Sequence, residues 1–201
     1  MRSLVLASRS PQRSAILARL GIRFEVRPSD VEELEEGEPE AVTMENALRK
    51  ARAVCDLERD EIVLGVDTLV ELDGRIYGKP ADERSAHEML RALSGARHTV
   101  TSAVALLDGG QERTALESTR VRFRECSERV IDWYIATGEW RGRAGGYAIQ
   151  GAGAALVREI HGDYENVVGL PVATLLDLCP GLLCAPASTH PSAEPSPSKR
   201  I

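Results

Sequence analysis

Asp67 and Thr68 interrupt an apolar stretch that otherwise has the character of a buried strand. Ile62, Val63 and Leu64, just before them, are the aliphatic and β-branched residues typical of strands that fill a core. A buried carboxylate without a partner is destabilising by several kcal/mol unless a cation or hydrogen bonds compensate. Asp67 therefore either has a partner inside the protein or is placed to bind one.

Lys79 is expected to return towards Asp67 through a hairpin. The Asp-Gly dipeptide at 73–74 is a tight-turn signal that folds residues 69–72 against residues 75–77. Taken alone, the segment equally fits a plain hairpin whose aspartate caps a loop. The rest of the chain decides between the two interpretations.

A candidate phosphate site lies near the start of the chain. Residues 3–7 form a short apolar strand, and Ser10 and Pro11 are a typical N-cap and first residue of a helix. A helix N-terminus points unpaired N–H groups and a positive dipole outward, so with Ser8 and Arg13 it suits an anion. A capped helix that carries a surface arginine is the alternative.

An acidic loop at 29–40 follows a second strand at 24–27. Most of its carboxylates are expected to be solvated, as in other charge runs. Glu32 or Glu33, close to the strand, is a candidate oxygen ligand for a hard cation such as Mg²⁺ or Mn²⁺.

Thr43 is expected to start an amphipathic helix that ends near residue 57 and carries Lys50 near its middle. A lysine ammonium is a compact charge suited to a phosphate oxygen, although most helix lysines lie on the surface. The patterns further along the chain predict helices at 82–93, 128–137 and 171–178, and strands at 98–107 and 114–124.

Residues 138–171 are rich in glycine, which permits tight turns and close approach of the backbone to a ligand. Gly151 and Gly153 suggest a dinucleotide-binding motif, but Leu156 stands where the third glycine belongs, and we reject that interpretation. The side-chain amide of Gln150 could pair with the edge of a nucleobase, or it could bond only to loop backbone.

The composition indicates one domain. The chain has 201 residues, of which 43% are hydrophobic and 28% charged, with a net charge of -6. The acidic balance disfavours a nucleic-acid partner, and no apolar run approaches the ~18 residues of a membrane span. The scattered cysteines fit reduced thiols and a cytoplasmic location. We expect a domain at 1–183 and a disordered tail rich in Pro, Ser and Ala at 184–201.

The motifs together resemble the Maf family of nucleoside triphosphate pyrophosphatases. The resemblance rests on segments 6–13, 65–68 with 78–80, 145–151 and 162–171, in the order of the family. It implies an α/β fold with a mixed, curved sheet flanked by helices, two lobes with a central cleft, and a homodimer. It also implies hydrolysis of a nucleoside triphosphate between its α and β phosphates.

The resemblance also implies a role for each matching residue. Asp67 becomes the proton acceptor and a ligand of a divalent metal, Mg²⁺ or Mn²⁺, and Glu33 becomes a second ligand. The residues expected to bind the triphosphate are Ser8, Arg13, Lys50 and Lys79. Those expected to set base specificity are Gln12, Thr68 and Gln150.

Two departures from the family pattern leave choices open. Gln12 stands where members that prefer dTTP and UTP commonly have arginine, whereas Gln150 matches that pyrimidine-preferring branch. Val31 is followed by Glu32 and Glu33 rather than by Asp and Glu. The leading hypothesis is a house-cleaning hydrolase of surplus or modified pyrimidine nucleotides. The alternatives are an inosine-triphosphate-type purine pyrophosphatase and a regulator of septation that binds nucleotide without cleaving it.

Overall fold

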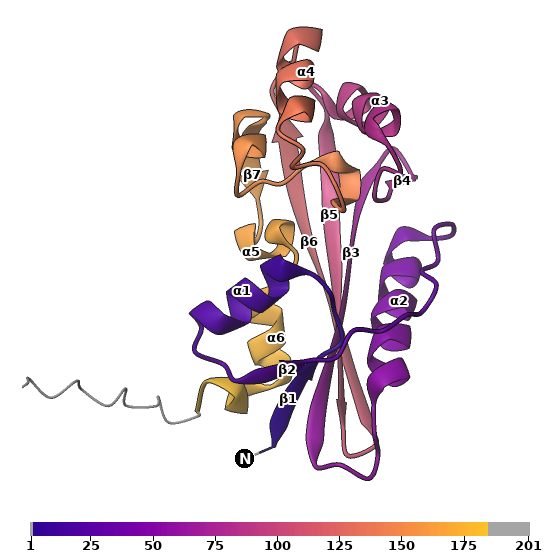
Figure 1. The fold of residues 1–201 in the computed structure, drawn as a ribbon, viewed down its shortest axis with the longest axis vertical. Coiled ribbons are helices and arrows are strands. Elements are labelled where there is room, and N and C mark those ends of the chain that lie inside the picture. The colour runs from indigo at the N-terminus through magenta and orange to yellow at the C-terminus, as the bar shows by residue number, and fades with distance from the viewer. Residues whose placement is uncertain (1, 185–201) are drawn as a thin grey trace, which may run out of the picture.

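Three long strands form the spine of the molecule, as Figure 1 shows for the computed structural model, which describes residues 2–184. They are β3 (Glu61–Leu72), β5 (Arg97–Asp108) and β6 (Gln111–Phe123). Each pairs antiparallel with the next, in the order β3-β5-β6. Strands β3 and β5 are buried along most of their length, which indicates that both faces of the sheet are covered there.

Shorter strands complete a mixed seven-stranded sheet of order β2-β1-β3-β5-β6-β7, with β4 paired to β3. The parallel pairs join β1 to β2 and to β3, and the remaining pairs are antiparallel. The short strands are β1 (Ser3–Leu6), β2 (Phe24–Val26), β4 (Arg75–Tyr77) and β7 (Val157–His161). The expected α/β class with a mixed sheet is confirmed.

Helices divide the molecule into two lobes along the spine (Figure 1). The lower lobe contains α1 (Pro11–Arg19), α2 (Pro39–Val54), α6 (Val172–Leu178) and the 3₁₀ turn η3 (Pro180–Cys184). The upper lobe contains α3 (Glu83–Leu93), α4 (Glu128–Ala136) and the 3₁₀ turns η1 (Ala144–Gly146) and η2 (Ala152–Ala155). The short helix α5 (Tyr164–Val168) lies between the lobes.

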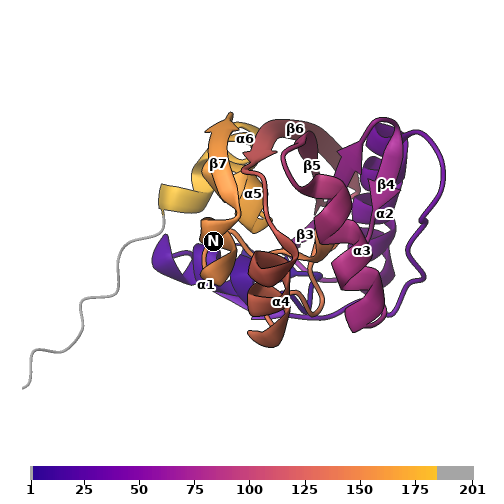
Figure 2. The same ribbon diagram turned by 90° about the horizontal axis from the view of Figure 1, so that it is seen from above.

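The lower lobe has a core on each face of the sheet. Seen from above, α2 lies on one side of the strands and α1 on the other (Figure 2). Leu64 and Val66 of β3 pack with α1 and α6, whereas Val63 packs with Ala47 and Ala51 of α2. The upper lobe has its own core, in which α3, α4 and the glycine-rich segment pack together.

Gly65 lets α2 lie directly on β3. A Cβ at this position would overlap the Ala47 carbonyl oxygen and would lie 2.9 Å from the Ala51 Cβ, which is too close for any side chain. Glycine is therefore required here because two backbones approach closely. The sequence around Gly65 gives no sign of this contact. This contact fixes the distance between Asp67 and the residues of α2.

One edge of β3 lacks a neighbouring strand over five residues. On that side β1 pairs with β3 as far as Leu64, and β4 begins to pair at Val70. Residues 65–69 therefore face no strand there within the described part of the chain. Because successive side chains of a strand point to opposite faces, an open edge makes both Asp67 and Thr68 accessible from one cleft.

The structure corrects several sequence-based expectations. Helix α2 starts at Pro39, with its missing N–H in the first turn, and not at Thr43, whose hydroxyl instead donates 2.6 Å to the Pro39 carbonyl. Strand β3 continues through Asp67 without a break, and β7 and α5 were not predicted. The expected tail falls almost wholly on residues 185–201, which lie outside the described residues.

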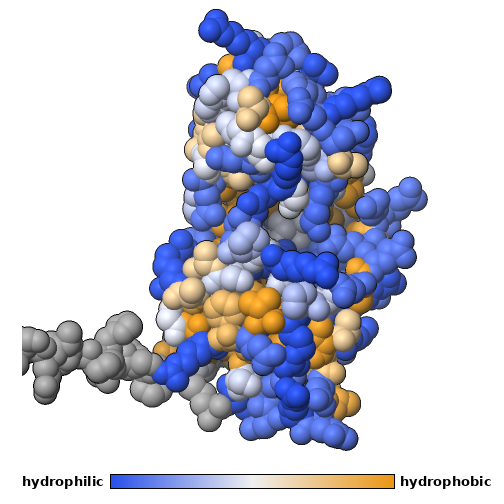
Figure 3. Space-filling model, viewed as in Figure 1, coloured by the Kyte–Doolittle hydropathy of each residue, from blue (hydrophilic) through white to orange (hydrophobic). Residues whose placement is uncertain are grey.

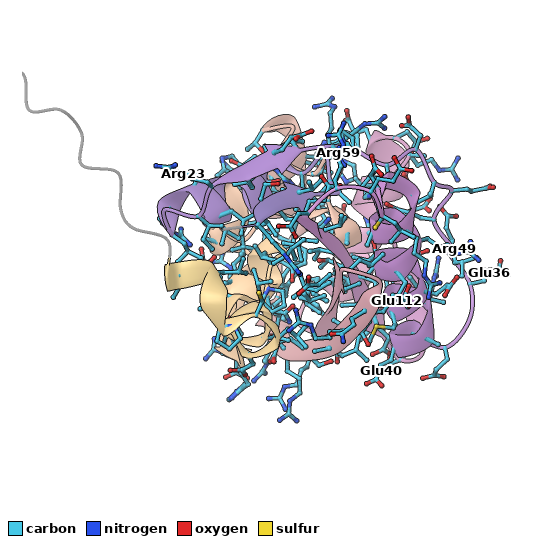
Figure 4. The ribbon with its side chains drawn as sticks, turned by 90° about the horizontal axis from the view of Figure 1, so that it is seen from below. Arg23, Glu36, Glu40, Arg49, Arg59 and Glu112 are labelled. Carbon is cyan, nitrogen blue, oxygen red and sulfur yellow. The ribbon has the colours of Figure 1, made fainter. Side chains whose placement is uncertain are left out.

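The outer surface carries most of the charge. The carboxylates of the acidic loop are largely exposed, as expected, and Glu36 and Arg49 point away from the body of the molecule (Figure 4). Arg120, Arg122 and Arg124 share an exposed face at the end of β6. Within residues 2–184, no helix is both long enough and apolar enough to cross a bilayer.

The close approach at Gly65 predicts a specific loss of stability. Gly65→Ala should lower the free energy of unfolding by about 1–3 kcal/mol, because overpacking forces α2 away from β3. Gly181→Ala is the matched control, since its Cβ would enter open space. Urea denaturation of both variants tests this, and equal stabilities would show that the contact is not tight.

Candidate active site

A cleft of about 840 Å³ opens between the two lobes. In the space-filling view of Figure 3, a recess lies at mid-height on a largely hydrophilic face. The cleft is lined by segments that are distant in sequence: residues 7–13, 29–31, 67–68, 141–144, 147–151 and 167–169, with Glu33, Lys50, Val70, Lys79, Val100 and Glu139. The structure brings together every site residue predicted from the sequence, since all of them line this cleft.

Asp67 is the buried centre of a chain of alternating charges. The Lys50 ammonium lies 2.5 Å from Asp67 Oδ1 and 2.7 Å from Glu33 Oε1. Lys79 in turn lies 2.9 Å from Glu33 Oε2. Asp67 and Lys50 are only 6% and 7% exposed. Lys50 is therefore not a surface lysine. Its ammonium, on α2, is the partner that the buried Asp67 requires.

Asn46 completes this cluster and was not singled out from the sequence. Its amide nitrogen donates to Asp67 Oδ2 at 3.4 Å and to the Leu34 carbonyl at 3.0 Å, and its oxygen accepts from the Leu34 N–H at 2.8 Å. Asn46 thus ties the acidic loop to Asp67. Its position one helical turn before Lys50, on the same face, is the signal that could have found it.

Lys50 and Lys79 keep the Glu33 carboxylate ionised. Burial would raise the pKa of Glu33, but Lys50 and Lys79 outweigh that effect and lower the pKa to about 2. Glu32 is exposed and lines a separate shallow hollow with Glu35, Glu36 and Arg49. Of the two carboxylates left open by the sequence, only Glu33 faces the cleft.

Arg13 brings a buried positive charge to the other side of β3. Its guanidinium donates to Ser8 Oγ at 3.0 Å, to Thr68 Oγ1 at 3.0 Å and to the Gly169 carbonyl at 2.8 Å. All three acceptors are neutral, and among the described residues no carboxylate forms an ion pair with it. Burial lowers the pKa of Arg13, while the nearby Asp67 charge acts to raise it.

The start of α1 lies beside this arginine. Ser10 is the N-cap and Pro11 the first helical residue, as expected, and Ser10 Oγ accepts from the Arg13 N–H. Gln12 faces the cleft, where its side-chain oxygen accepts from Ser10 Oγ at 3.2 Å. The helix N-terminus, Ser8 and Arg13 thus form one anion-favouring surface.

Thr68 acts on this surface through Arg13. Its hydroxyl lies 3.0 Å from the Arg13 guanidinium and 2.8 Å from Ser102 Oγ. Thr68 therefore lines the cleft and also orients the Arg13 guanidinium by accepting its hydrogen bond.

Gln150 lies on the opposite wall, in the glycine-rich segment of the upper lobe. Two buried tyrosines anchor that segment: Tyr147 Oη lies 2.9 Å from His98 Nε2, and Tyr134 Oη accepts from the Ala148 N–H at 2.9 Å. Burial lowers the pKa of His98 to about 4, so the ring is neutral near pH 7. The tyrosine contacts hold the backbone of this segment in place, and the Gln150 side chain on it is exposed.

The same wall carries three charged residues that sequence reasoning missed. Glu139, Arg141 and Arg143 all line the cleft. They belong to no recognisable local pattern, and only the fold of the glycine-rich segment turns them inward.

A group of possible metal ligands lies away from the cleft. His87, Glu128 and Asp132 offer ligand atoms within 4.8 Å of one another on α3 and α4. Glu128, however, is already gripped by Arg91 through bonds of 2.7–3.0 Å. In the cleft, by contrast, Asp67 and Glu33 both contact the Lys50 ammonium. Carboxylate oxygens grouped in this way are the ligands that Mg²⁺ and Mn²⁺ prefer.

Comparison with known proteins gives a consistent result. The family described as "Maf-like protein" matches residues 3–181. A dTTP/UTP pyrophosphatase from Pelotomaculum thermopropionicum is 44% identical over 89% of this chain and 95% of its own length. Proteins with the same description from Symbiobacterium thermophilum and Pyrococcus furiosus are 48% and 42% identical, over 86% and 89% of this chain and 90% and 94% of theirs.

The lysine pair predicts how Glu33 titrates. In the wild-type protein the pKa of Glu33 should be about 2, and Lys79→Gln should raise it because one charge and two hydrogen bonds are lost. The stabilising effect of the ionised Glu33 should be present above about pH 4.5 and be lost as the pH falls towards 2. Carboxyl ¹³C NMR titration measures this, with Lys79→Arg as the charge-conserving control. A pKa near 4.5 in the wild type would contradict the ion-pair geometry.

Proposed function

This chain belongs to the Maf-like protein family, and from that premise we propose that it is a nucleoside triphosphate pyrophosphatase that favours dTTP and UTP. It hydrolyses the bond between the α and β phosphates and releases the nucleoside monophosphate and pyrophosphate. The observation that carries the proposal is Asp67, a buried carboxylate held by Lys50 inside a cleft lined with cations. The relatives described as dTTP/UTP pyrophosphatases support the pyrimidine preference.

Phosphate binding uses the cations on the two sides of β3. Arg13 has neutral partners only, so a phosphate oxygen supplies the counter-charge that the described residues do not. Ser8 and the N–H groups of α1 bind the same anion, and Lys50 and Lys79 approach it from the other face. A chain with a net charge of -6 thereby holds a polyanion through local cations.

Asp67 takes the proton of the attacking water. In the free protein its Oδ1 is held at 2.5 Å by Lys50. The arriving phosphates compete for the same ammonium, which frees Asp67 Oδ1 to accept the proton. Asn46 keeps the other oxygen, Oδ2, in position at 3.4 Å. The cations then stabilise the charge that develops on the transferred phosphoryl group.

A divalent cation, Mg²⁺ or Mn²⁺, fits the carboxylate pair. Asp67 and Glu33 would hold it, since both approach the same point and hard cations prefer carboxylate oxygens. Such an ion would neutralise phosphate charge and help to activate the attacking water. Lys79 keeps Glu33 ionised in its absence.

Base selection belongs to the upper wall and the start of α1. Gln150 offers an amide that both donates and accepts, and Gln12 lines the cleft from the lower lobe. Thr68 contributes by orienting Arg13. The proposed physiological role is the removal of surplus or modified pyrimidine nucleotides. A cytoplasmic setting agrees with Cys55, Cys126 and Cys179, which are free thiols.

The test of the reaction is a pyrophosphate-release assay with dTTP, UTP and the other common nucleoside triphosphates. We expect monophosphate and pyrophosphate as products, and a loss of ~100-fold or more in kcat for Asp67→Asn, which removes the base. Nucleotide binding without release of pyrophosphate would favour a regulator instead. A preference for inosine triphosphate would move the protein to the purine-specific class.

The metal assignment predicts a difference between neighbouring glutamates. Glu33→Gln should raise the Mg²⁺ concentration needed for half-maximal activity by about 10-fold or more, because one anionic ligand is lost. Glu32→Gln, the adjacent exposed residue, is the matched control and should leave that concentration unchanged. Equal effects of the two substitutions would remove Glu33 from the metal site.

A further inference from the structure

Two polar atoms on the upper wall of the cleft are buried and have no hydrogen-bond partner within the described residues. They are Glu139 Oε2 and Arg143 Nε. Both residues line the cleft. Buried polar groups in folded proteins are nearly always paired. Of the seven unpaired buried atoms among the described residues, these two alone belong to residues that line the cleft, where a ligand can supply the partner.

The two residues do not satisfy each other. The charge of Glu139 is close enough to act on the Arg143 guanidinium, yet no ion pair within 4.0 Å joins them in the part of the chain that the structure describes. Each keeps its unpaired atom, and neither atom is exposed to solvent in the ligand-free cleft. The side chains of Glu139 and Arg143 thus bring one strong acceptor and one donor to the wall of the cleft.

The Glu139 carboxylate lies beside the glutamine expected to read the base. It rests against the backbone of Gly151, where an added Cβ would lie 2.4 Å from Glu139 Oε2 and 2.5 Å from Glu139 Oε1. A side chain at this position would have to displace the carboxylate, and Gly151 directly follows Gln150 in the sequence. Glu139 and Gln150 are thus neighbours on the wall opposite Arg13 and the start of α1.

The chemistry of a carboxylate restricts its ligand. An ionised carboxylate only accepts hydrogen bonds, and it repels the phosphates of the substrate. It therefore faces an N–H or O–H group. The pairing edge of uracil and thymine offers a carbonyl, the N3–H imide and a second carbonyl. Cytosine has a bare acceptor nitrogen at N3, which a carboxylate repels.

We propose that Glu139 is a specificity-determining residue that accepts the N3–H of the pyrimidine base, while Arg143 and Gln150 donate to the flanking carbonyls. This inference rests on the proposed function and deepens it. It explains discrimination between UTP and CTP through a buried, unpaired acceptor placed opposite N3, the position at which cytosine supplies no donor. Arg143 Nε is the matching donor.

The test compares kcat/KM for UTP, CTP and N3-methyl-UTP, which lacks the imide proton. Glu139→Gln should lower the UTP-to-CTP ratio by about 10-fold or more, because an amide can also donate to the cytosine ring nitrogen. Glu139→Ala, which makes room for the methyl group, should lower the ratio of UTP to N3-methyl-UTP by a similar factor. Glu125→Gln, an exposed residue outside the cleft, is the control and should change neither ratio.

The outcomes separate this inference from the proposed function. If the wild-type protein releases pyrophosphate from no triphosphate, the proposed function fails. If it does, but the Glu139 variants keep both ratios while losing activity on every base equally, Glu139 has only a structural role and the inference fails. If the variants instead lose discrimination between dTTP and its 3′-deoxy analogue, the carboxylate binds the sugar hydroxyl and the inference also fails. Melting temperatures measured for each variant show whether the fold is intact.

Discussion

The buried ion pair between Lys50 and Asp67 is the interaction on which the rest of the site depends. Two charges removed from water are tolerated only when their geometry and remaining hydrogen bonds are satisfied, and removing either one leaves the other uncompensated. Lys50 meets Asp67 at 2.5 Å and Glu33 at 2.7 Å, which links a helix, a central strand and the acidic loop. Gly65 sets the distance at which that helix lies. Packing and electrostatics therefore specify the same arrangement, and a change in one disturbs the other.

The open edge of β3 explains how two opposed faces serve one cleft. In a strand paired on both sides, Asp67 and Thr68 would be separated by the sheet. Here β1 stops at Leu64 and β4 starts at Val70, so the intervening residues are reached from the side. Asp67 and Lys50 approach a ligand from the face of α2, and Arg13 approaches from the face of α1. A polyanion placed at the edge is surrounded rather than merely touched.

Much of this arrangement is predictable from the sequence, because local patterns encode it. The cap at Ser10, the strand through residues 62–64 and the need of Asp67 for a partner all follow from residue type and spacing.

Contacts between residues that are distant in sequence cannot be predicted in this way. Arg13 bonds to the carbonyl of Gly169, a backbone group that no pattern announces. Lys50 looks like any helix lysine until α2 is placed on β3. Glu139 and Arg143 face inward only because the glycine-rich segment is folded back by Tyr134 and Tyr147. Strand β7 was missed because its residues, Val157–His161, are mostly half-exposed and only weakly alternating.

The two lobes share β3, β5 and β6, which run unbroken from one to the other (Figure 1). Domain hinges absorb their motion at a few loop or terminal residues, whereas a continuous three-stranded ribbon resists bending and yields mainly by changing its twist. We therefore expect little hinge motion between the lobes, so that the width of the cleft changes little. Selectivity for the proposed nucleotide then has to come from groups already in place on the walls, and binding requires little reorganisation of the protein.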